Sequence, residues 1–108
     1  MDWKIEYYSE SVQREILTLS AGLLARYIHL TDRMIGFGPK LGMPHTRSMD
    51  KGLFELRLKA AEGIARVFFF ARTGQRVVML HQFVKKSQET PPKETKIARR
   101  RMKEMQNA

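Results

Sequence analysis

Three strand-like runs follow one another at residues 53–59, 64–71 and 76–84. Each is rich in leucine, β-branched or aromatic residues, and the first alternates apolar with charged side chains, as strands with one buried face do. The two connections are four residues long and contain glycine, which favours hairpins. This feature constrains the fold most, because it predicts an antiparallel meander on which the other elements must pack.

The remaining patterns indicate one more strand and several helices. Residues 3–8 alternate at period two and predict a short first strand. Apolar residues then recur at helical spacing over 12–19 and 23–35, after a serine at position 9 or 11 that can cap the first helix. We expect two helices packed as a hairpin, with one bent helix as the alternative. Residues 36–52 hold four glycines and two prolines and are expected to form a loop.

Pro91 and Pro92 stand at the start of a last helical pattern, where proline is tolerated. The predicted element order is therefore β-α-α-β-β-β-α in a single domain, residues 1–108. The fold class is α+β, with a helical hairpin packed on a small, mainly antiparallel sheet and a basic C-terminal helix.

Composition excludes several classes of site. The chain contains no cysteine, which excludes a disulfide framework, a thiolate zinc site and a cysteine nucleophile and fits a reducing cytoplasm. The longest apolar run, residues 67–71, has five residues, far short of the roughly 20 that span a bilayer. His29 and His45 have no partner at metal-ligand spacing, so we expect no metal and no cofactor.

The basic charge is concentrated in one half of the chain. The 20 Lys and Arg exceed the 11 Asp and Glu by a formal charge of +9. Residues 1–50 hold six of each sign, whereas residues 51–108 hold 14 basic and five acidic residues. Such asymmetry indicates a polyanionic partner, most often a nucleic acid.

An arginine in the middle strand is the most informative single residue. Arg66 lies in a run that is otherwise apolar on both faces, and an arginine there is costly unless it is paired or reaches an opening. One interpretation is an ion pair with Glu55 or Glu62. The other is that Arg66 and Arg57 project from adjacent strands into a concave face that binds anions.

Further basic residues extend that face and the terminal helix. Lys59 and one of Lys85 and Lys86 would add positive charge beside the two arginines. His81 is either a core histidine or a titratable group near the phosphate-binding cations. The segment from Lys85 to Lys103 is too one-sided for ordinary surface and favours nucleic-acid contact over a membrane surface. Its cations are Lys85, Lys86, Lys93, Lys96, Arg99, Arg100, Arg101 and Lys103.

Three motifs carry a family likeness. They are Glu55-Leu56-Arg57, Arg66-Val67-Phe68-Phe69, and the run from His81 through Lys85-Lys86 to Thr90-Pro91. Together with the basic last helix, these motifs resemble the phage-derived, HigB-like branch of the RelE/ParE toxin superfamily. The predicted element order is also that of the RelE-like fold.

The resemblance implies the toxin of a type II toxin–antitoxin pair, a metal-independent endoribonuclease that cuts mRNA in the ribosomal A site. Its partners would be mRNA, ribosomal RNA and a helix-turn-helix, HigA-like antitoxin, and it would meet operator DNA only through the antitoxin complex. The family's catalytic cations fall on Arg57, Arg66 and Lys86 (or Lys85), with Lys59 in support. No tyrosine follows Tyr27, so the tyrosine that some relatives use is missing, and His81 is the expected substitute.

Two other functions remain open from the sequence. The same superfamily includes ParE-like toxins that target gyrase and are not nucleases. A basic protein that binds nucleic acid without catalysis would show the same excess of charge, because phosphate neutralisation alone requires Lys and Arg.

Overall fold

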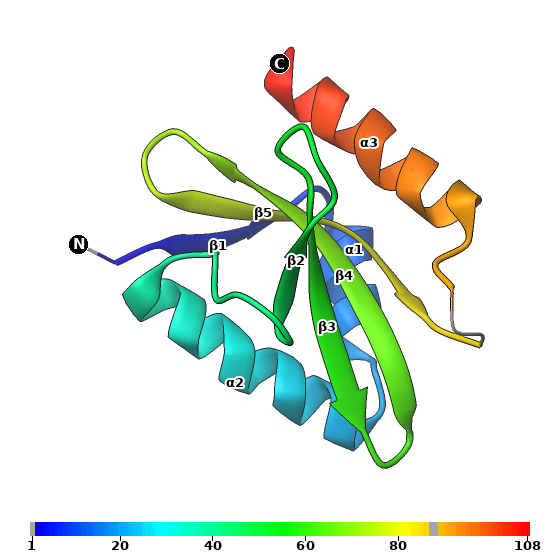
Figure 1. The fold of residues 1–108 in the computed structure, drawn as a ribbon. Helices are drawn as coiled ribbons and strands as arrows, with labels where there is room; N and C mark the ends of the chain where they lie inside the picture. The colour runs from blue at the N-terminus through cyan, green and yellow to red at the C-terminus, as the bar shows by residue number, and fades with distance from the viewer. Residues whose placement is uncertain (1, 87–88) are drawn as a thin grey trace.

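The three strand-like runs form the centre of a five-stranded sheet. The computed structural model describes residues 2–86 and 89–108 and shows one sheet with helices on both faces (Figure 1). The elements are β1 (Lys4–Tyr7), α1 (Glu10–Leu17), α2 (Ala21–Phe37), β2 (Thr46–Ser48), β3 (Phe54–Ala60), β4 (Gly63–Arg72), β5 (Arg76–Val84) and α3 (Pro92–Gln106). The strand order is β1-β5-β4-β3-β2. The predicted α+β fold is confirmed.

The strands of the meander pair in the antiparallel order that their short connections require. β3, β4 and β5 are antiparallel neighbours, and Gly74 and Gln75 adopt positive φ in the turn before β5. β1 lies parallel to β5 at one edge of the sheet. Parallel neighbours need a long crossover, which here consists of the two helices and the first part of the meander.

The predicted loop at residues 36–52 is wrong in two respects. α2 continues through Gly36 to Phe37 and ends at Gly38, whose φ of 92° terminates the helix. The loop also contains β2, which pairs antiparallel with the first half of β3 and adds a strand to the predicted order. A three-residue edge strand has no periodicity to detect, and it is held by its partner strand.

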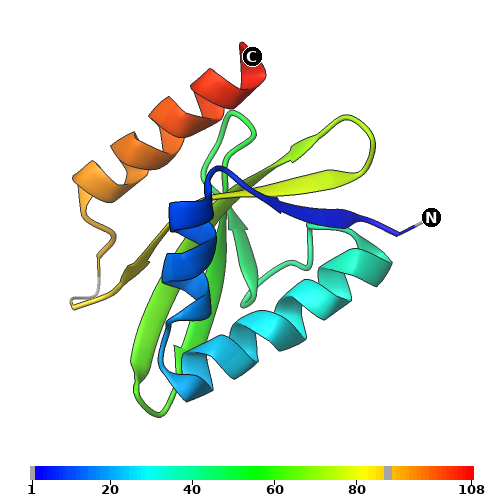
Figure 2. The ribbon, with the colours of Figure 1, turned by 180° about the vertical axis from the view of Figure 1, so that it is seen from behind.

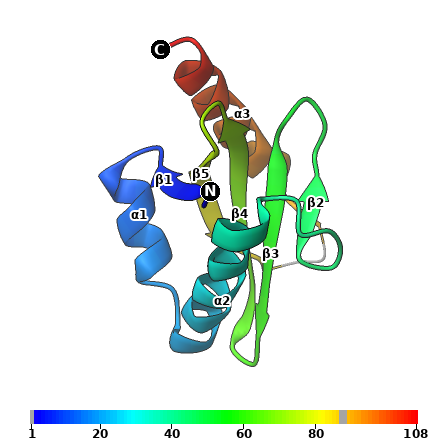
Figure 3. The same cartoon turned by 90° about the vertical axis from the view of Figure 1, so that its left-hand side faces the viewer.

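Side chains alternate between two apolar cores. On one face, β3 and β4 contribute Leu56, Leu58, Val67 and Phe69, and α1 and α2 cover them, as Figure 2 shows from behind. α1 packs over β1 and β5, whereas α2 packs over β3, β4 and β1, so each helix covers its own part of the sheet (Figure 3). The predicted alternation in β3 is confirmed.

Among the described elements, α3 is the helix that covers the opposite face. Ala98 and Met102 of α3 pack with Phe68, Phe70 and residues of β5. The helix packs against β4 and β5, so the part of this face formed by β3 is not covered by it. In the described part of the chain no helix has the length and apolar character to cross a membrane.

Two hydrogen bonds join segments that are distant in the sequence. Glu62, in the β3–β4 turn, accepts a 2.5 Å hydrogen bond from the Gly22 N–H in the first turn of α2. Ser20, the residue before this helix, makes no side-chain capping bond, so the carboxylate of Glu62 serves as the anion at the helix N-terminus. On the other face, Arg101 donates to the carbonyl of Leu80, the extra residue at a β-bulge in β5.

Candidate active site

Arg57 and Arg66 face each other directly across β3 and β4. The N–H of Arg57 donates to the His45 carbonyl at 2.8 Å, on the side of β3 away from β4. The two arginines therefore form a non-hydrogen-bonded pair, the type in which opposite Cα atoms lie only about 4.5 Å apart. The register itself brings the two guanidinium groups together.

Glu55 stabilises this pair of like charges. Its side chain is 2% exposed, and its Oε1 lies 3.3 Å from Arg66 Nε and 3.8 Å from Arg57 Nε. The hydroxyl of Thr90 donates to the other carboxylate oxygen at 3.3 Å. The predicted ion pair between Arg66 and Glu55 is thus confirmed, and so is the placement of Arg57 beside Arg66. The ion pair and the adjacency of the two arginines thus occur together, and anion binding by this face stays a prediction.

The arginines differ in how much water they meet. The side chain of Arg66 is 5% exposed, and burial lowers its pKa while Glu55 acts in the opposite direction. Arginine remains protonated in proteins, so both groups carry charge. The side chain of Arg57 is 31% exposed, which leaves its guanidinium accessible to a ligand. Arg57 therefore forms the accessible half of the pair and Arg66 the buried half.

A cleft of about 350 Å³ opens over this pair, between the sheet and the segment that leads into α3. We call it the central cleft. Its lining is Arg47, Met49, Glu55, Arg57, Arg66, Lys85, Glu89, Thr90 and Thr95. Four cations thus stand against two carboxylates, and the surplus of positive charge makes the cleft suited to an anion such as phosphate.

Lys85, rather than Lys86, is the lysine that lines the central cleft. Burial lowers the pKa of Lys85, and the positive charges of Arg66, Arg57 and Arg47 lower it further, against the effect of Glu55. Lys86 is exposed and lines neither the central cleft nor the pocket that holds Lys59.

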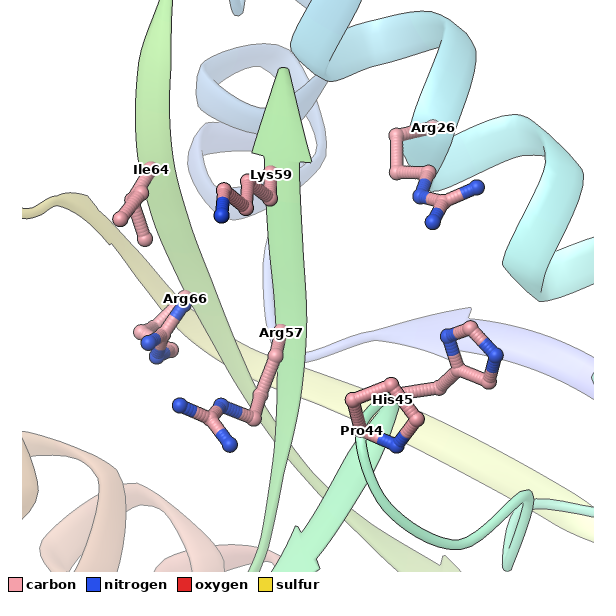
Figure 4. Close-up of a pocket in the computed structure, with 7 residues that line it drawn as sticks. All are labelled: Arg26, Pro44, His45, Arg57, Lys59, Ile64 and Arg66. Carbon is pink, nitrogen blue, oxygen red and sulfur yellow. The ribbon is translucent and has the colours of Figure 1, made fainter.

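His81 lies apart from the cleft. Its Nε2 donates to Glu94 Oε1 at 2.8 Å, in the first turn of α3. Its ring stacks near those of Phe68 and Phe83 on the face that α3 covers. Lys59 lies on the other side of Arg57 and Arg66, in an adjoining pocket (Figure 4). Of the predicted site residues, the central cleft gathers Arg57, Arg66 and Lys85.

Comparison with known proteins gives the family. The family model described as "Phage derived protein Gp49-like (DUF891)" matches residues 14–103, most of the chain. The chain belongs to the Gp49-like family. This match includes every motif on which the resemblance to the phage-derived branch of the RelE/ParE superfamily rests, and that resemblance is confirmed.

The fold of this Gp49-like chain is similar to that of one chain in a solved protein complex. The structure is that of the archaeal RelE–RelB complex from Pyrococcus horikoshii OT3, with a TM-score of 0.58 and 13% sequence identity. The match covers 80% of the Gp49-like chain and 98% of the other chain. At this identity the likeness concerns the fold. No protein of curated function matches the chain by sequence.

The cations of α3 divide into two groups in the Gp49-like chain. Arg99 donates to the carbonyls of Met49 and Asp50, and Arg101 donates to Leu80 and lies over the ring of Tyr8. These two arginines fasten the helix to the sheet and to the β2–β3 connection. The exposed group consists of Lys93, Lys96, Arg100 and Lys103, which recur at helical spacing along one stripe.

Several residues of the cavities escaped the sequence interpretation. Arg47 and Thr90 line the central cleft, and Arg26 and His45 line the adjoining pocket. Arg47 lies in the short β2, directly opposite Glu55, in the segment that was expected to be a loop. The only signal for it was a basic residue in a Gly- and Pro-rich segment, and that signal is shared by many surface loops.

Proposed function

We propose that this chain is the toxin of a type II toxin–antitoxin pair and acts as an endoribonuclease on mRNA. The observation that carries the proposal is the close pair of Arg57 and Arg66 at the floor of a cationic cleft, held by the buried Glu55. Family membership and the RelE-like fold support the same class of protein.

The chemistry needs little more than fixed positive charge. RNA supplies its own nucleophile, the 2′-hydroxyl, which attacks the adjacent phosphorus and expels the 5′-oxygen of the next nucleotide. Negative charge develops on the non-bridging oxygens in the transition state. Arg57 is accessible enough to donate to these oxygens, and Arg66 adds positive potential from beneath. Because Glu55 already orients both groups, little reorganisation accompanies the reaction.

Lys85 is the proposed proton-transfer group. It lines the central cleft, and its pKa is lowered by burial and by the neighbouring arginines. A lysine with a lowered pKa is a better general base than an ordinary one and, once protonated, a better acid. His81 is committed to Glu94 under α3 and is the weaker candidate, and Lys86 is exposed outside the cleft.

The proposal extends to partners. The exposed stripe of α3 is suited to bind ribosomal RNA while mRNA occupies the central cleft in the A site. A helix-turn-helix antitoxin would neutralise the toxin and carry the complex to operator DNA. The protein would act in the cytoplasm, where ribosomes are found.

The test compares two arginine variants in cells. Arg57→Gln removes the more accessible arginine of the Arg57–Arg66 pair, and Arg14→Gln makes the same change at an exposed arginine of α1 as a control. Each protein is expressed from a tightly regulated promoter, and new 5′ ends on a cellular transcript are mapped by primer extension. We expect cleavage by wild type and Arg14→Gln, and a loss of about 10²–10³-fold in rate for Arg57→Gln.

Other outcomes would point to the other functions. Growth arrest by the wild type without new RNA ends contradicts the nuclease proposal. If broken chromosomal DNA accumulates instead, the protein is a ParE-like gyrase toxin. If RNA binding is retained and neither RNA nor DNA is cut, it is a non-catalytic binding protein.

A further inference from the structure

A second cavity, which we call the edge pocket, lies beside the central cleft at the open edge of β3. Its volume is about 310 Å³. Arg26 of α2, His45 from the segment before β2 and Lys59 of β3 surround its opening, as Figure 4 shows. Arg57 and Arg66 line both this pocket and the central cleft, so the two cavities are contiguous.

The shortness of β2 creates this pocket. β2 pairs with β3 only from Phe54 to Leu56, so within the described residues the second half of β3 has no neighbouring strand on that side. The N–H of Arg57 points to this edge, where it donates to His45. Backbone N–H groups alternate in direction along a strand, so the N–H of Lys59 points to the same edge, toward the pocket.

The edge pocket is more strongly cationic than the central cleft. Arginine or lysine side chains reach it from α2, β3 and β4, and no acidic residue of the described chain lines it. Burial lowers the pKa of His45, and the charges of Arg33 and Arg26 and the nearby His29 lower it further, as expected where the potential is positive. An anion is therefore the ligand that the pocket fits.

We infer that the edge pocket binds the phosphate next to the scissile one in the same RNA strand. This inference rests on the proposed function, because it takes the central cleft as the site of the scissile phosphate. A ligand that fills both cavities passes over Arg57 and needs an anionic group on each side of it. Consecutive phosphates of a single strand meet this requirement, and Arg26 and Lys59 would hold the second one by charge-assisted hydrogen bonds.

The test measures what a second phosphate adds to binding. The probe is an RNA trinucleotide with two phosphodiesters and no terminal phosphate, 2′-O-methylated so that it is not cut. Its partner probe has one phosphodiester replaced by an uncharged methylphosphonate of similar size. Both are titrated into the full chain and followed by NMR chemical shifts at constant low salt, because phosphate contacts depend strongly on salt.

We expect the second charge to tighten binding by wild type about tenfold, and to tighten binding by Arg26→Gln less than about twofold. Arg14→Gln, the matched control on α1, should keep the full tenfold gain. Equal gains in wild type and Arg26→Gln would overturn the inference. So would a wild type that gains nothing from the second charge.

The outcome is separable from that of the proposed function. If wild type cuts mRNA but the gain from the second phosphate does not depend on Arg26, the inference alone fails. If the gain depends on Arg26 but no RNA is cut in cells, the nuclease proposal fails and the pocket still binds RNA.

Discussion

Replacing Arg66 by methionine should destabilise the fold, because it leaves the carboxylate of Glu55 buried with one cation fewer. The two side chains are 5% and 2% exposed, and Arg66 Nε lies 3.3 Å from Glu55 Oε1. Methionine fills most of the space of the arginine stem, so the loss reports the charge more than a cavity. The substitution therefore measures how far the fold depends on the ion pair.

The expected loss is about 3 kcal/mol. Removing one partner of a buried pair costs about 3–5 kcal/mol when the other charge is left uncompensated. Here Arg57 remains 3.8 Å from Glu55, and Thr90 still donates a hydrogen bond, so the lower end of that range applies. Glu55→Gln should cost about 2 kcal/mol, because like charges directly opposite in a sheet are destabilising and the amide compensates them poorly.

The double variant, Glu55→Gln with Arg66→Met, decides whether the two residues act as a pair. It buries neither charge, so we expect a loss of about 2–3 kcal/mol instead of the roughly 5 kcal/mol given by adding the single losses. Free energies of unfolding come from urea titrations followed by far-ultraviolet circular dichroism. Additive losses, or a loss below about 1 kcal/mol for Arg66→Met, would refute the reasoning.

Two further predictions concern the surface of the molecule. Hydrogen bonds from the backbone N–H groups of Glu62 and Gly22 lower the pKa of the Glu62 carboxyl below its ordinary 4.5. The ionised carboxylate therefore stabilises the fold above pH 4.5, and this stabilisation is lost as the pH falls through the folded-state pKa. Urea titrations at decreasing pH should show Glu62→Gln less stable than wild type at neutral pH and equal to it in acid; a constant difference would contradict the assignment. On α3, Lys96→Gln should reduce the slope of log affinity for single-stranded RNA against log salt by about 0.7 for each phosphate that the protein no longer neutralises. Arg101→Gln should instead lower the free energy of unfolding, because Arg101 donates a hydrogen bond to the Leu80 carbonyl. RNA-binding titrations at several salt concentrations and urea titrations on both variants check this division between RNA-binding and structural cations. An unchanged salt slope for Lys96→Gln would exclude Lys96 from the RNA interface.

The sequence predicted those features that depend on local pattern. Alternation in residues 53–59 placed Leu56 and Arg57 on opposite faces, and the four-residue connection to the next strand fixed the hairpin closely enough to bring Arg57 and Arg66 together. Period-two patterns and short turns act over a few residues, so a single chain reveals them. The same reasoning offered Glu55 as a partner of Arg66, which the structure has.

Features that depend on tertiary packing were not predictable in this way. β2 is held by pairing with β3, and Arg47 enters the central cleft only because of that pairing. Arg26 reaches the edge pocket because α2 runs past the open part of β3, which no spacing in the sequence reveals. The six cations of the terminal helix look alike in sequence, and only contacts with Met49 and Leu80 separate Arg99 and Arg101 from the exposed stripe.

The buried Glu55 explains how a cleft of cations is compatible with a stable fold. α3 covers the apolar part of its face and leaves Arg57 and Arg66 beyond it, where the two positive groups lie side by side. A carboxylate between them offsets their repulsion, yet it also reduces the positive potential that a phosphate meets. Glu55 approaches each arginine at Nε, and of the two terminal nitrogens of Arg57 one makes a long contact of 3.8 Å with the sulfur of Met43, which a phosphate oxygen would replace with a stronger, charge-assisted bond. The same ion pair can therefore stabilise the two arginines and keep them oriented for contact with an anion.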